Sequence, residues 1–320
     1  MFSFFKKLYN KSECNSPTSN LMFKWVVGQV QGKLLKNYSF VWTKFAIYRE
    51  PILTNDKTIT LRKWHGMDSE DTFYKGSKTK YGPDDIEYKT NSNGFRVYNE
   101  TQNIKNNTIL CFGCSNTFGT GLPDNETWPY ILNEKLGFDK YKCVNLGASG
   151  ASSDTIARLI YSYFTNHTGV RKPKAIVCLF PDVFRMEYFS SNSEYITSLC
   201  PHGSKFADKT DFINYHRFVN EEVAFFNFVK NFKFIETICA LHKIELIWHT
   251  WSDFLLEFKA ETLIKFLGSN GIYRDGYLYN IPNPTRARDG SHHGYEYQNE
   301  LAKEFYIRIK SSNISYHKTS

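Results

Sequence analysis

The sequence predicts an α/β fold: a doubly wound, flavodoxin-like parallel sheet of about five strands, with helices on both faces. Three observations support this. From residue 108 onward, short apolar runs alternate with longer amphipathic segments, as in βαβ units. The runs are four to six residues long and mostly apolar, which is typical of strands buried on both faces. Several of them end in glycine- or proline-containing loops, and ligands bind at such loops in open α/β sheets.

The elements of this domain are predicted in the following order. The strands cover 108–112, 142–145, 175–180 and 245–249, and the helices cover 128–136, 154–166 with Asp154 as its cap, 220–242, 254–266 and 295–310. At least one predicted helix therefore separates each strand from the next, as crossover connections between parallel strands require.

Residues 108–320 form the predicted α/β domain, and two regions precede it. Residues 1–50 are predicted to be a basic amphipathic helical segment, because apolar residues such as Phe23, Val27 and Val30 recur at helical spacing among lysines. We expect its apolar stripe to contact the main domain or a partner chain, with a membrane surface as the alternative. Residues 51–107 are predicted to be an irregular connecting region, with a turn and a short strand at 91–100.

The charge of the chain is concentrated at its start. The net charge is +8 over 320 residues, and residues 1–50 hold eight Lys and Arg against two Glu, a balance of +6. The other 270 residues are therefore nearly neutral. Because binding to nucleic acid relies on a basic surface, we predict no nucleic-acid partner for the main domain.

The cysteines and the apolar segments bear on location. The seven cysteines are an odd number, and Cys111 and Cys178 fall within apolar runs, which favours free buried thiols and a reducing compartment. No uninterrupted apolar stretch reaches the roughly 18 residues of a membrane span. The first residues lack the apolar region and cleavage site of a Sec signal peptide. A cytoplasmic location is the simplest expectation.

A candidate nucleophile lies in the stretch 108–121, TILCFGCSNTFGTG, where a strand runs into a glycine-rich bend. Ser115 is at the bend. A hydroxyl on a sharp turn at the end of a strand is exposed, rigidly held and close to free N–H groups, as a nucleophilic serine must be. A single serine in such a turn is more often structural, so the prediction depends on partner residues elsewhere in the chain.

The partner residues lie near the C-terminus, where Asp289 precedes His292 by three positions in the sequence DGSH. Across this short turn the carboxylate can bind Nδ1 of the imidazole and leave Nε2 free to accept a proton from a serine. The neighbouring His293 is expected to turn away from Asp289. His202 and His249 are expected to be solvent-exposed or structural.

Two further loops follow predicted strands and complete the candidate site. The loop that ends at Gly150 lets a backbone N–H approach a reacting carbonyl oxygen. Asp182 and Arg185 come directly after the third strand. All these loops lie at the same edge of the predicted sheet.

Together these blocks resemble the SGNH hydrolases, also called GDSL-type lipases and esterases. The Gly-Asp-Ser block is matched by GCSNTFG at 113–119, the glycine block by NLGASG at 145–150, and the Asp-x-x-His block by 289–292. The resemblance covers about residues 108–310. It implies a serine esterase without metal or cofactor, with Ser115 as nucleophile, His292 as base and Asp289 as its orienting partner. It also implies that the N–H groups of Ser115 and Gly150 stabilise the oxyanion.

The sequence departs from the family pattern at two places. Cys114 stands where the family usually has Asp. The third block, usually Gly-x-Asn-Asp, corresponds to 180–183, so that Asp182 lies near the position of the oxyanion-binding Asn. An ionised Asp only accepts hydrogen bonds and would repel an oxyanion. Three solutions stay open: Asp182 is protonated, Arg185 is the donor, or the two backbone groups suffice.

The sequence thus predicts a serine hydrolase that cleaves an ester. It does not fix the substrate, and the resemblance implies a short acyl group, for example an O-acetyl group on a carbohydrate. Arg185 and the aromatic-rich segment 184–215 could bind that substrate, and an equal alternative is that these aromatic residues are core packing. The competing hypothesis is a catalytically inactive SGNH-like domain that binds a glycan or has a structural role. The Cys111-x-x-Cys114 pair is not predicted to be a redox or zinc site, because Cys111 belongs to a strand and no second ligand pair exists.

Overall fold

The structure is a computed structural model in which residues 59–75, 79–91, 94–98, 107–166, 172–189, 196–200, 209–256, 267, 281 and 284–312 are described. The chain divides into two units, Met1–Ala46 with Phe189–Ile196, and Ile47–Tyr188 with Thr197–Ser320. The predicted amphipathic segment 1–50 lies outside the described residues. The account below concerns the second unit.

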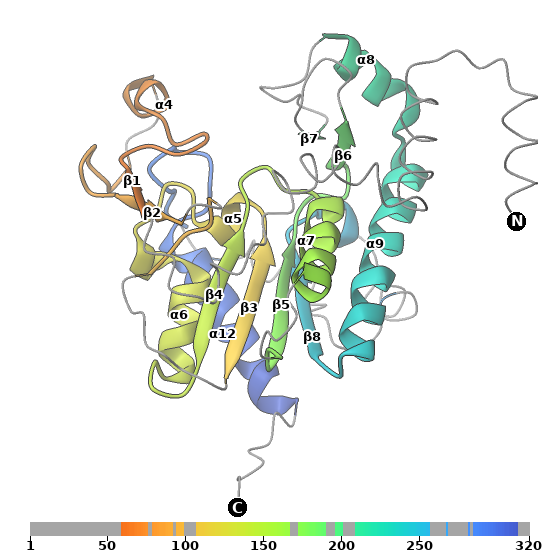
Figure 1. Ribbon diagram of the computed structural model, residues 1–320. Helices are drawn as coiled ribbons and strands as arrows, with labels where there is room; N and C mark the ends of the chain where they lie inside the picture. Colours follow the sequence, from red (N-terminus) through yellow and green to blue (C-terminus); the bar gives the residue numbers. More distant parts are fainter. Residues whose placement is uncertain are drawn as a thin grey trace, which may run out of the picture. The chain divides into compact units, whose positions relative to one another are not determined.

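A parallel sheet of four strands, in the order β4-β3-β5-β8, forms the centre of this unit (Figure 1). The strands are β3 (Thr108–Gly113), β4 (Lys142–Gly147), β5 (Ala175–Phe180) and β8 (Glu245–Thr250). The first of them along the chain, β3, pairs with both the second and the third. This order is that of flavodoxin-like sheets. The doubly wound fold is confirmed, and the described residues contain four of its strands where about five were expected.

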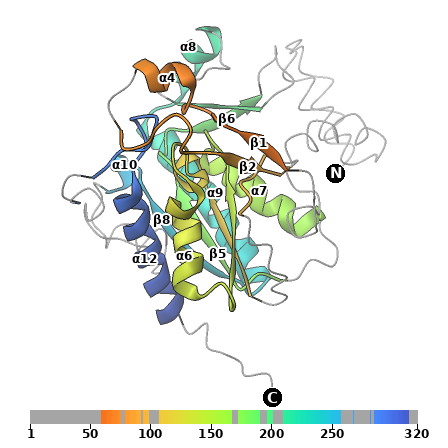
Figure 2. The same ribbon diagram turned by 90° about the vertical axis from the view of Figure 1, so that its left-hand side faces the viewer.

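Helices cover both faces of the sheet (Figures 1 and 2). On one face lie α6 (Trp128–Leu136) and α12 (Tyr295–Ser311), which contact each other. On the other lie α7 (Ser153–Asn166) and α9 (Glu221–Leu241), which also contact each other. The sequence prediction places these four helices within two residues of their observed bounds.

Adjacent residues of each strand belong to different hydrophobic cores, one on each face of the sheet. Ile109 and Val177 pack with α6 and α12, whereas Leu110 and Ile176 pack with α7 and α9. Successive side chains of a strand point to opposite faces, so a strand between two helical layers must be apolar at every position. All six residues of β5 are buried, which explains why its sequence is an unbroken apolar run.

The start of α7 differs from the prediction that Asp154 caps it. The cap is Ser152, whose Oγ accepts a hydrogen bond from the Thr155 N–H at 3.3 Å. Asp154 lies inside the first turn of the helix, and its carboxylate accepts hydrogen bonds from the Nδ2 groups of Asn227 and Asn231 on α9. The prediction is therefore wrong, because the carboxylate joins two helices instead of closing the end of one.

Several elements of the loops were not predicted. They are α5 (Ser115–Phe118), the 3-10 helix η2 (Asp124–Glu126), the paired strands β6 (Met186–Phe189) and β7 (Ile196–Leu199), and α8 (Lys209–Phe218). Of the helix predicted at 254–266, the described part is α10 (Asp253–Leu256), and the remainder, 257–266, lies outside the described residues.

The described part of 51–107 packs against the loops of the α/β domain. It contains β1 (Thr60–Arg62), α4 (Glu70–Lys75) and β2 (Tyr88–Thr90), and β1 and β2 are antiparallel. A turn follows β2, in which the Gly94 N–H donates to the Asn91 carbonyl. Residues of this region form a small core with Phe118 and Leu122 after β3 and Ala287 before α12. It therefore contacts the two loops that carry the candidate nucleophile and base.

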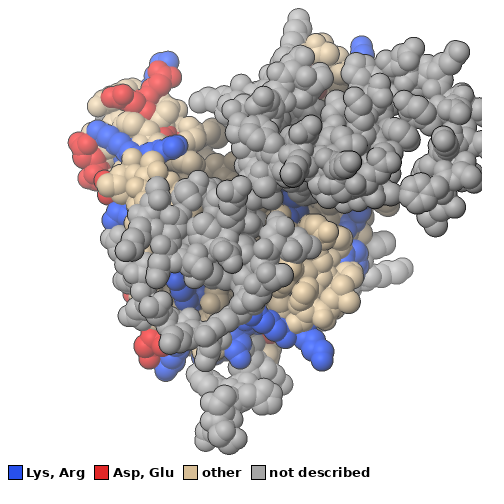
Figure 3. Space-filling model, in the orientation of Figure 1, with Lys and Arg blue, Asp and Glu red and all other residues tan. Residues whose placement is uncertain are grey.

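On the face shown in Figure 3, acidic side chains gather around α4, with basic side chains beside them. Glu70 and Asp71 lie in the first turn of this helix and Lys75 in its last, an arrangement that complements the helix dipole. Among the helices of the described residues, none combines the length and the apolar character needed to cross a bilayer.

Candidate active site

Ser115 is the first residue of α5, directly beyond the carboxyl end of β3. Its loop lies where the strand order reverses, between β3 and β5, the usual ligand-binding position in such sheets. The turn from strand to helix is tight: a Cβ atom on Gly147, at the end of β4, would lie 2.2 Å from the Phe118 nitrogen. Glycine at 147 thus allows α5 to approach the sheet edge, and Ser115 is held there with 7% of its surface exposed.

The structure brings Ser115, His292 and Asp289 together as the sequence predicts. The Nε2 atom of His292 lies 2.7 Å from the Oγ atom of Ser115. The Nδ1 atom of the same ring contacts Oδ2 of Asp289. The other carboxylate oxygen of Asp289 accepts hydrogen bonds from the backbone N–H groups of Ser291, at 3.1 Å, and His292, at 3.0 Å. The three side chains therefore form one continuous line of polar contacts.

The charge of Asp289 is stabilised although the residue is 97% buried, with 3% of its surface exposed. Burial raises its pKa, but the hydrogen bonds from the His292 ring and from the two backbone N–H groups outweigh burial, and the pKa lies below its ordinary value. An ionised carboxylate only accepts hydrogen bonds. It therefore holds the proton of His292 on Nδ1 and leaves Nε2 as an acceptor for the Ser115 hydroxyl.

Two backbone N–H groups are free to bind an oxyanion. Ser115 begins α5, so its N–H has no partner within the helix. Gly150 is exposed, has a φ of +82°, and has no atom within 4 Å of the position of a Cβ. Among the described residues, neither N–H donates a hydrogen bond.

Asp182 and Arg185 lie in the turn that follows β5. Oδ1 of Asp182 accepts a hydrogen bond from the Phe184 N–H at 2.9 Å, and its carbonyl accepts one from the Arg185 N–H at 3.1 Å. The Arg185 guanidinium lies 5.0 Å from the centre of the Trp251 ring. The Trp251 indole N–H donates to Sγ of Cys114 at 3.3 Å. The Asp182 side chain thus stabilises its own turn. Arg185 lies against Trp251, which in turn contacts Cys114 in the loop of Ser115.

The two cysteines of the C-x-x-C pair are both buried. Burial and the neighbouring Cys143 thiol raise the pKa of Cys111 well above its ordinary value, which keeps this thiol protonated. The Sγ atom of Cys114 lies 3.9 Å from Ser115 Oγ. In the described part of the chain, no group of three or more His, Cys, Asp or Glu side chains is placed to hold a metal ion.

Arg96, which was not predicted from the sequence, holds the loop of the candidate nucleophile Ser115. Its guanidinium donates to the carbonyls of Phe118 at 3.1 Å, Gly119 at 2.7 Å and Leu122 at 2.7 Å. Its Nε donates to Asp124 at 2.6 Å. Arginine is ordinarily a surface residue, so the sequence contains no signal that Arg96 is buried.

Two buried amides also hold α5. Asn145 Nδ2 donates to the Thr117 carbonyl at 2.9 Å. Gln298, on α12, donates to the Asn116 carbonyl at 3.2 Å and accepts a hydrogen bond from the Trp128 N–H at 2.9 Å. Hydrogen bonds therefore join α5, the helix of Ser115, to β4 and to α12, and Gln298 also joins α12 to α6. Asn145 lies within the predicted glycine block, whereas Gln298 was not anticipated.

Residues before the α/β domain form one side of the site. The His65 ring stacks on Phe118, with 4.2 Å between the ring centres. Burial, together with the charges of Arg62 and Arg96, lowers the pKa of His65 to about 4. A Cβ atom on the next residue, Gly66, would lie 3.8 Å from the side chain of Ser149. This loop therefore borders both α5, the helix of Ser115, and the loop of Gly150.

The other predicted histidine positions differ in their surroundings. His293 stacks on Tyr297, with ring centres 4.1 Å apart, and its ring is not the one that contacts Ser115. His249 is buried in β8, and His202 lies outside the described residues.

Comparison with known proteins found no matching family model and no matching curated protein. Solved structures do match, among them TesA, with 13% identity over 64% of this chain and 98% of that one and a TM-score of 0.43. The psychrotrophic esterase EstA from Pseudoalteromonas sp. has 12% identity over 65% and 98%, with a TM-score of 0.40. AlinE4, an SGNH-hydrolase family esterase, has 14% identity over 65% and 97%, with a TM-score of 0.35. These likenesses are weak, so the chemistry is inferred from the site itself.

Proposed function

We propose that the protein is a serine hydrolase of the SGNH (GDSL) type, which cleaves an ester through an acyl-enzyme. The observation that carries this proposal is the line of contacts from Ser115 Oγ through the His292 ring to Asp289. A serine paired with a base, and a base oriented by a carboxylate, is the general arrangement of an activated nucleophile.

In the first half of the reaction Ser115 Oγ attacks the ester carbonyl and its proton passes to Nε2 of His292. The new C–O bond converts the carbonyl oxygen to an oxyanion, which the N–H groups of Ser115 and Gly150 stabilise. The ionised Asp289 stabilises the imidazolium. Collapse of this intermediate breaks the bond to the alcohol, which leaves with the proton from Nε2.

In the second half a water molecule takes the place of the alcohol. His292 accepts its proton while the oxygen attacks the acyl carbon, and the second intermediate collapses to release the acid and return the proton to Ser115 Oγ. Neither half needs a metal or a cofactor.

The substrate proposed is an ester with a short acyl group, of which an O-acetyl group on a carbohydrate is the favoured example. Arg185 and Trp251 are proposed to border the substrate, because Trp251 contacts Cys114, the neighbour of the nucleophile. Two aromatic residues of the segment 184–215 serve packing instead: Phe184 packs edge to face against Phe254, and Tyr215 is buried and donates to the Phe184 carbonyl.

Labelling with a fluorophosphonate probe tests the proposal, since the probe reacts with an activated serine. We expect the wild-type protein to be labelled and to hydrolyse p-nitrophenyl acetate, and Ser115→Ala to do neither. The matched control is Ser311→Ala, which removes an exposed hydroxyl at the end of α12 and should leave both signals unchanged.

Absence of labelling and of hydrolysis in the folded wild-type protein would overturn the proposal. It would favour the alternative of an inactive SGNH-like domain that binds a glycan or has a structural role. Binding of acetylated and deacetylated oligosaccharides to Ser115→Ala, measured by calorimetry, then separates a glycan-binding protein from a structural one.

A further inference from the structure

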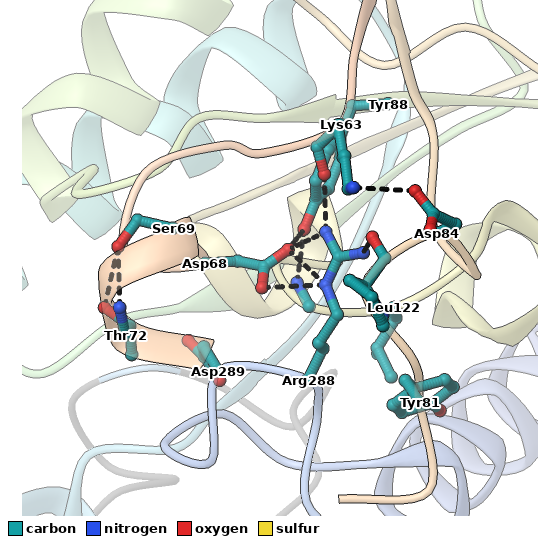
Figure 4. Close-up of polar contacts among 12 residues, drawn as sticks. Lys63, Asp68, Ser69, Thr72, Tyr81, Asp84, Tyr88, Leu122, Arg288 and Asp289 are labelled. Atoms are coloured by element: carbon teal, nitrogen blue, oxygen red, sulfur yellow. Dashed lines mark hydrogen bonds and ion pairs between the residues drawn. The ribbon is translucent and has the colours of Figure 1, made fainter. Parts of the chain in front are cut away.

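Arg288, the residue directly before Asp289, forms a fully buried ion pair with Asp68, 220 positions earlier in the chain. Neither side chain has exposed surface. The guanidinium binds the carboxylate through two nitrogens, at 2.7 Å and 3.0 Å. Its remaining donors reach the carbonyls of Pro83 at 2.9 Å and Lys63 at 2.5 Å. In Figure 4 the guanidinium faces Asp68, on the side away from the Asp289 carboxylate.

Tyr88 and Gly121 close this pair into a ring. The Tyr88 hydroxyl donates to Asp68 and accepts a hydrogen bond from the Gly121 N–H at 2.7 Å. The Gly121 carbonyl in turn accepts one from the Arg288 N–H at 2.8 Å. Burial and the Asp68 charge raise the pKa of Tyr88, so its hydroxyl stays a donor. We call Asp68, Tyr88, Gly121 and Arg288 the clasp.

The clasp joins the two loops that carry the reacting side chains. Gly121 ends the glycine-rich loop of Ser115, and Arg288 begins the loop of Asp289 and His292. The two loops are in close backbone contact: a Cβ atom on Gly121 would lie 2.8 Å from Ala287 Cβ and 2.9 Å from the Arg288 nitrogen. The third component, with Asp68 and Tyr88, comes from the region that precedes the α/β domain.

We propose that Asp68, Tyr88 and Arg288 are positioning residues, which fix the His292 loop at the distance from Ser115 that proton transfer requires. This inference rests on the proposed function. A misplacement of about 1 Å between reacting groups can reduce the rate about 10²-fold. None of the three side chains contacts Ser115 or His292 in the described structure, so each acts through the backbone that it holds.

The chemistry of the clasp makes it sensitive to small changes. Asp68→Asn leaves the buried Arg288 charge without a counter-charge, which is strongly unfavourable. Arg288→Lys keeps the charge but loses the planar fork that binds the carboxylate through two nitrogens. Tyr88→Phe keeps the ring and removes the hydroxyl that joins Asp68 to Gly121. Each of the three variants thus removes a different contact of the clasp.

The kinetic test compares these variants with Glu187→Gln. Glu187 pairs with Arg158 at 2.7 Å and has 12% of its side chain exposed, and it lies on β6 and contacts neither the Ser115 loop nor the His292 loop. We expect kcat for p-nitrophenyl acetate to fall about 10²-fold in Asp68→Asn and Arg288→Lys, with KM changed less than about twofold. Glu187→Gln should lose a similar amount of thermal stability and keep its kcat. Equal kcat values in clasp and control variants, once corrected for the folded fraction, would overturn the inference.

A second readout does not depend on turnover. The proton between His292 Nδ1 and Asp289 gives a low-field proton NMR resonance, which we expect in the wild-type protein and in Ser115→Ala. The clasp variants should shift or broaden this resonance, and Glu187→Gln should not. If the wild-type protein is inactive but the resonance responds to the clasp, the proposed function fails and the clasp stands. If the wild-type protein is active but neither kcat nor the resonance responds, the clasp fails and the proposed function stands.

Discussion

The Nε2 atom of His292 lies 2.7 Å from the Oγ atom of Ser115, although 177 positions separate the two residues. Asp289, which contacts the same ring, is by contrast only three positions from His292 in the sequence. The proposed base and its carboxylate thus lie on one loop, and the proposed nucleophile lies at the sheet edge. Changes at Asp289 therefore act on the imidazole directly, whereas changes between the loops act on it through the backbone of the His292 loop.

Asp289→Asn should abolish most activity while the protein stays folded. An amide in this place can donate to Nδ1, which stabilises the tautomer with its proton on Nε2 and removes the acceptor for Ser115. We expect kcat to fall about 10⁴-fold, as for the corresponding change in serine proteases. The measurement is p-nitrophenyl acetate hydrolysis, with the exposed Asp84→Asn as a control. A loss of less than about tenfold would contradict a role for Asp289 in orienting the base.

His65 should make the stability of the protein sensitive to acid. Its pKa is about 4 in the folded protein and about 6.5 in an unfolded chain. Between these values the unfolded state binds more protons, so the free energy of unfolding falls as the pH falls from 6.5 toward 4. From pH 7 to pH 5 this contribution is about 2 kcal/mol.

Urea unfolding at pH 7 and pH 5 measures this effect. His65→Gln should lose about 2 kcal/mol less than the wild-type protein between the two pH values. His216→Gln, which changes an exposed imidazole on α8, should behave like the wild-type protein. The same pH dependence in His65→Gln and in the wild-type protein would show that His65 does not control the acid response.

Asp182→Asn should raise activity. The amide oxygen can keep the hydrogen bond from the Phe184 N–H, while the side chain loses its negative charge and gains a donor in the turn after β5, the strand next to β3. Because one oxyanion donor is worth about 10²- to 10³-fold in rate, we expect kcat to rise at least tenfold. Asp182→Ala removes the contact to Phe184 and adds no donor, so it should lower thermal stability without this gain. An unchanged kcat in Asp182→Asn would show that the side chain at position 182 takes no part in the oxyanion hole.

The helices and strands that the sequence predicts best are those whose burial gives a recognisable pattern of apolar residues within a few consecutive positions. The bounds of β5 and α6 were predicted to the residue, because a strand between two helical layers is apolar throughout and Pro129 marks the first turn of its helix. The contact between Asp289 and His292 was also predictable, since both lie in one turn.

The residues that were not predicted correctly have hydrogen-bond partners that are far away in the sequence. Arg96 and Arg288 are buried among partners that come from several segments of the chain. In the sequence both look like ordinary surface arginines. Asp154 was assigned a local role as a cap, but two of its partners, Asn227 and Asn231, lie more than 70 positions away on α9. A polar residue with distant partners has no periodic signal, so its role appears only when the fold is known.

Gly121→Ala should be far more harmful than Gly94→Ala, although both glycines have a positive φ, +77° and +83°. The cost of that backbone conformation for alanine, about 1 to 2 kcal/mol, is common to both. Of the two, only Gly121 lies close to another loop: a Cβ on Gly121 would lie 2.8 Å from Ala287 Cβ, whereas nothing lies within 4 Å of a Cβ on Gly94. Overpacking of this kind costs about 1 to 3 kcal/mol more.

Urea unfolding and p-nitrophenyl acetate hydrolysis measure this difference. We expect Gly121→Ala to lose about 2 to 5 kcal/mol of stability and a large part of its kcat, because the added methyl group separates the Ser115 loop from the His292 loop. Gly94→Ala should lose about 1 to 2 kcal/mol and keep its kcat, since its turn carries no reacting side chain. Equal losses in the two variants would mean that the loops adjust to the methyl group, and that their close contact does not set the distance between Ser115 and His292.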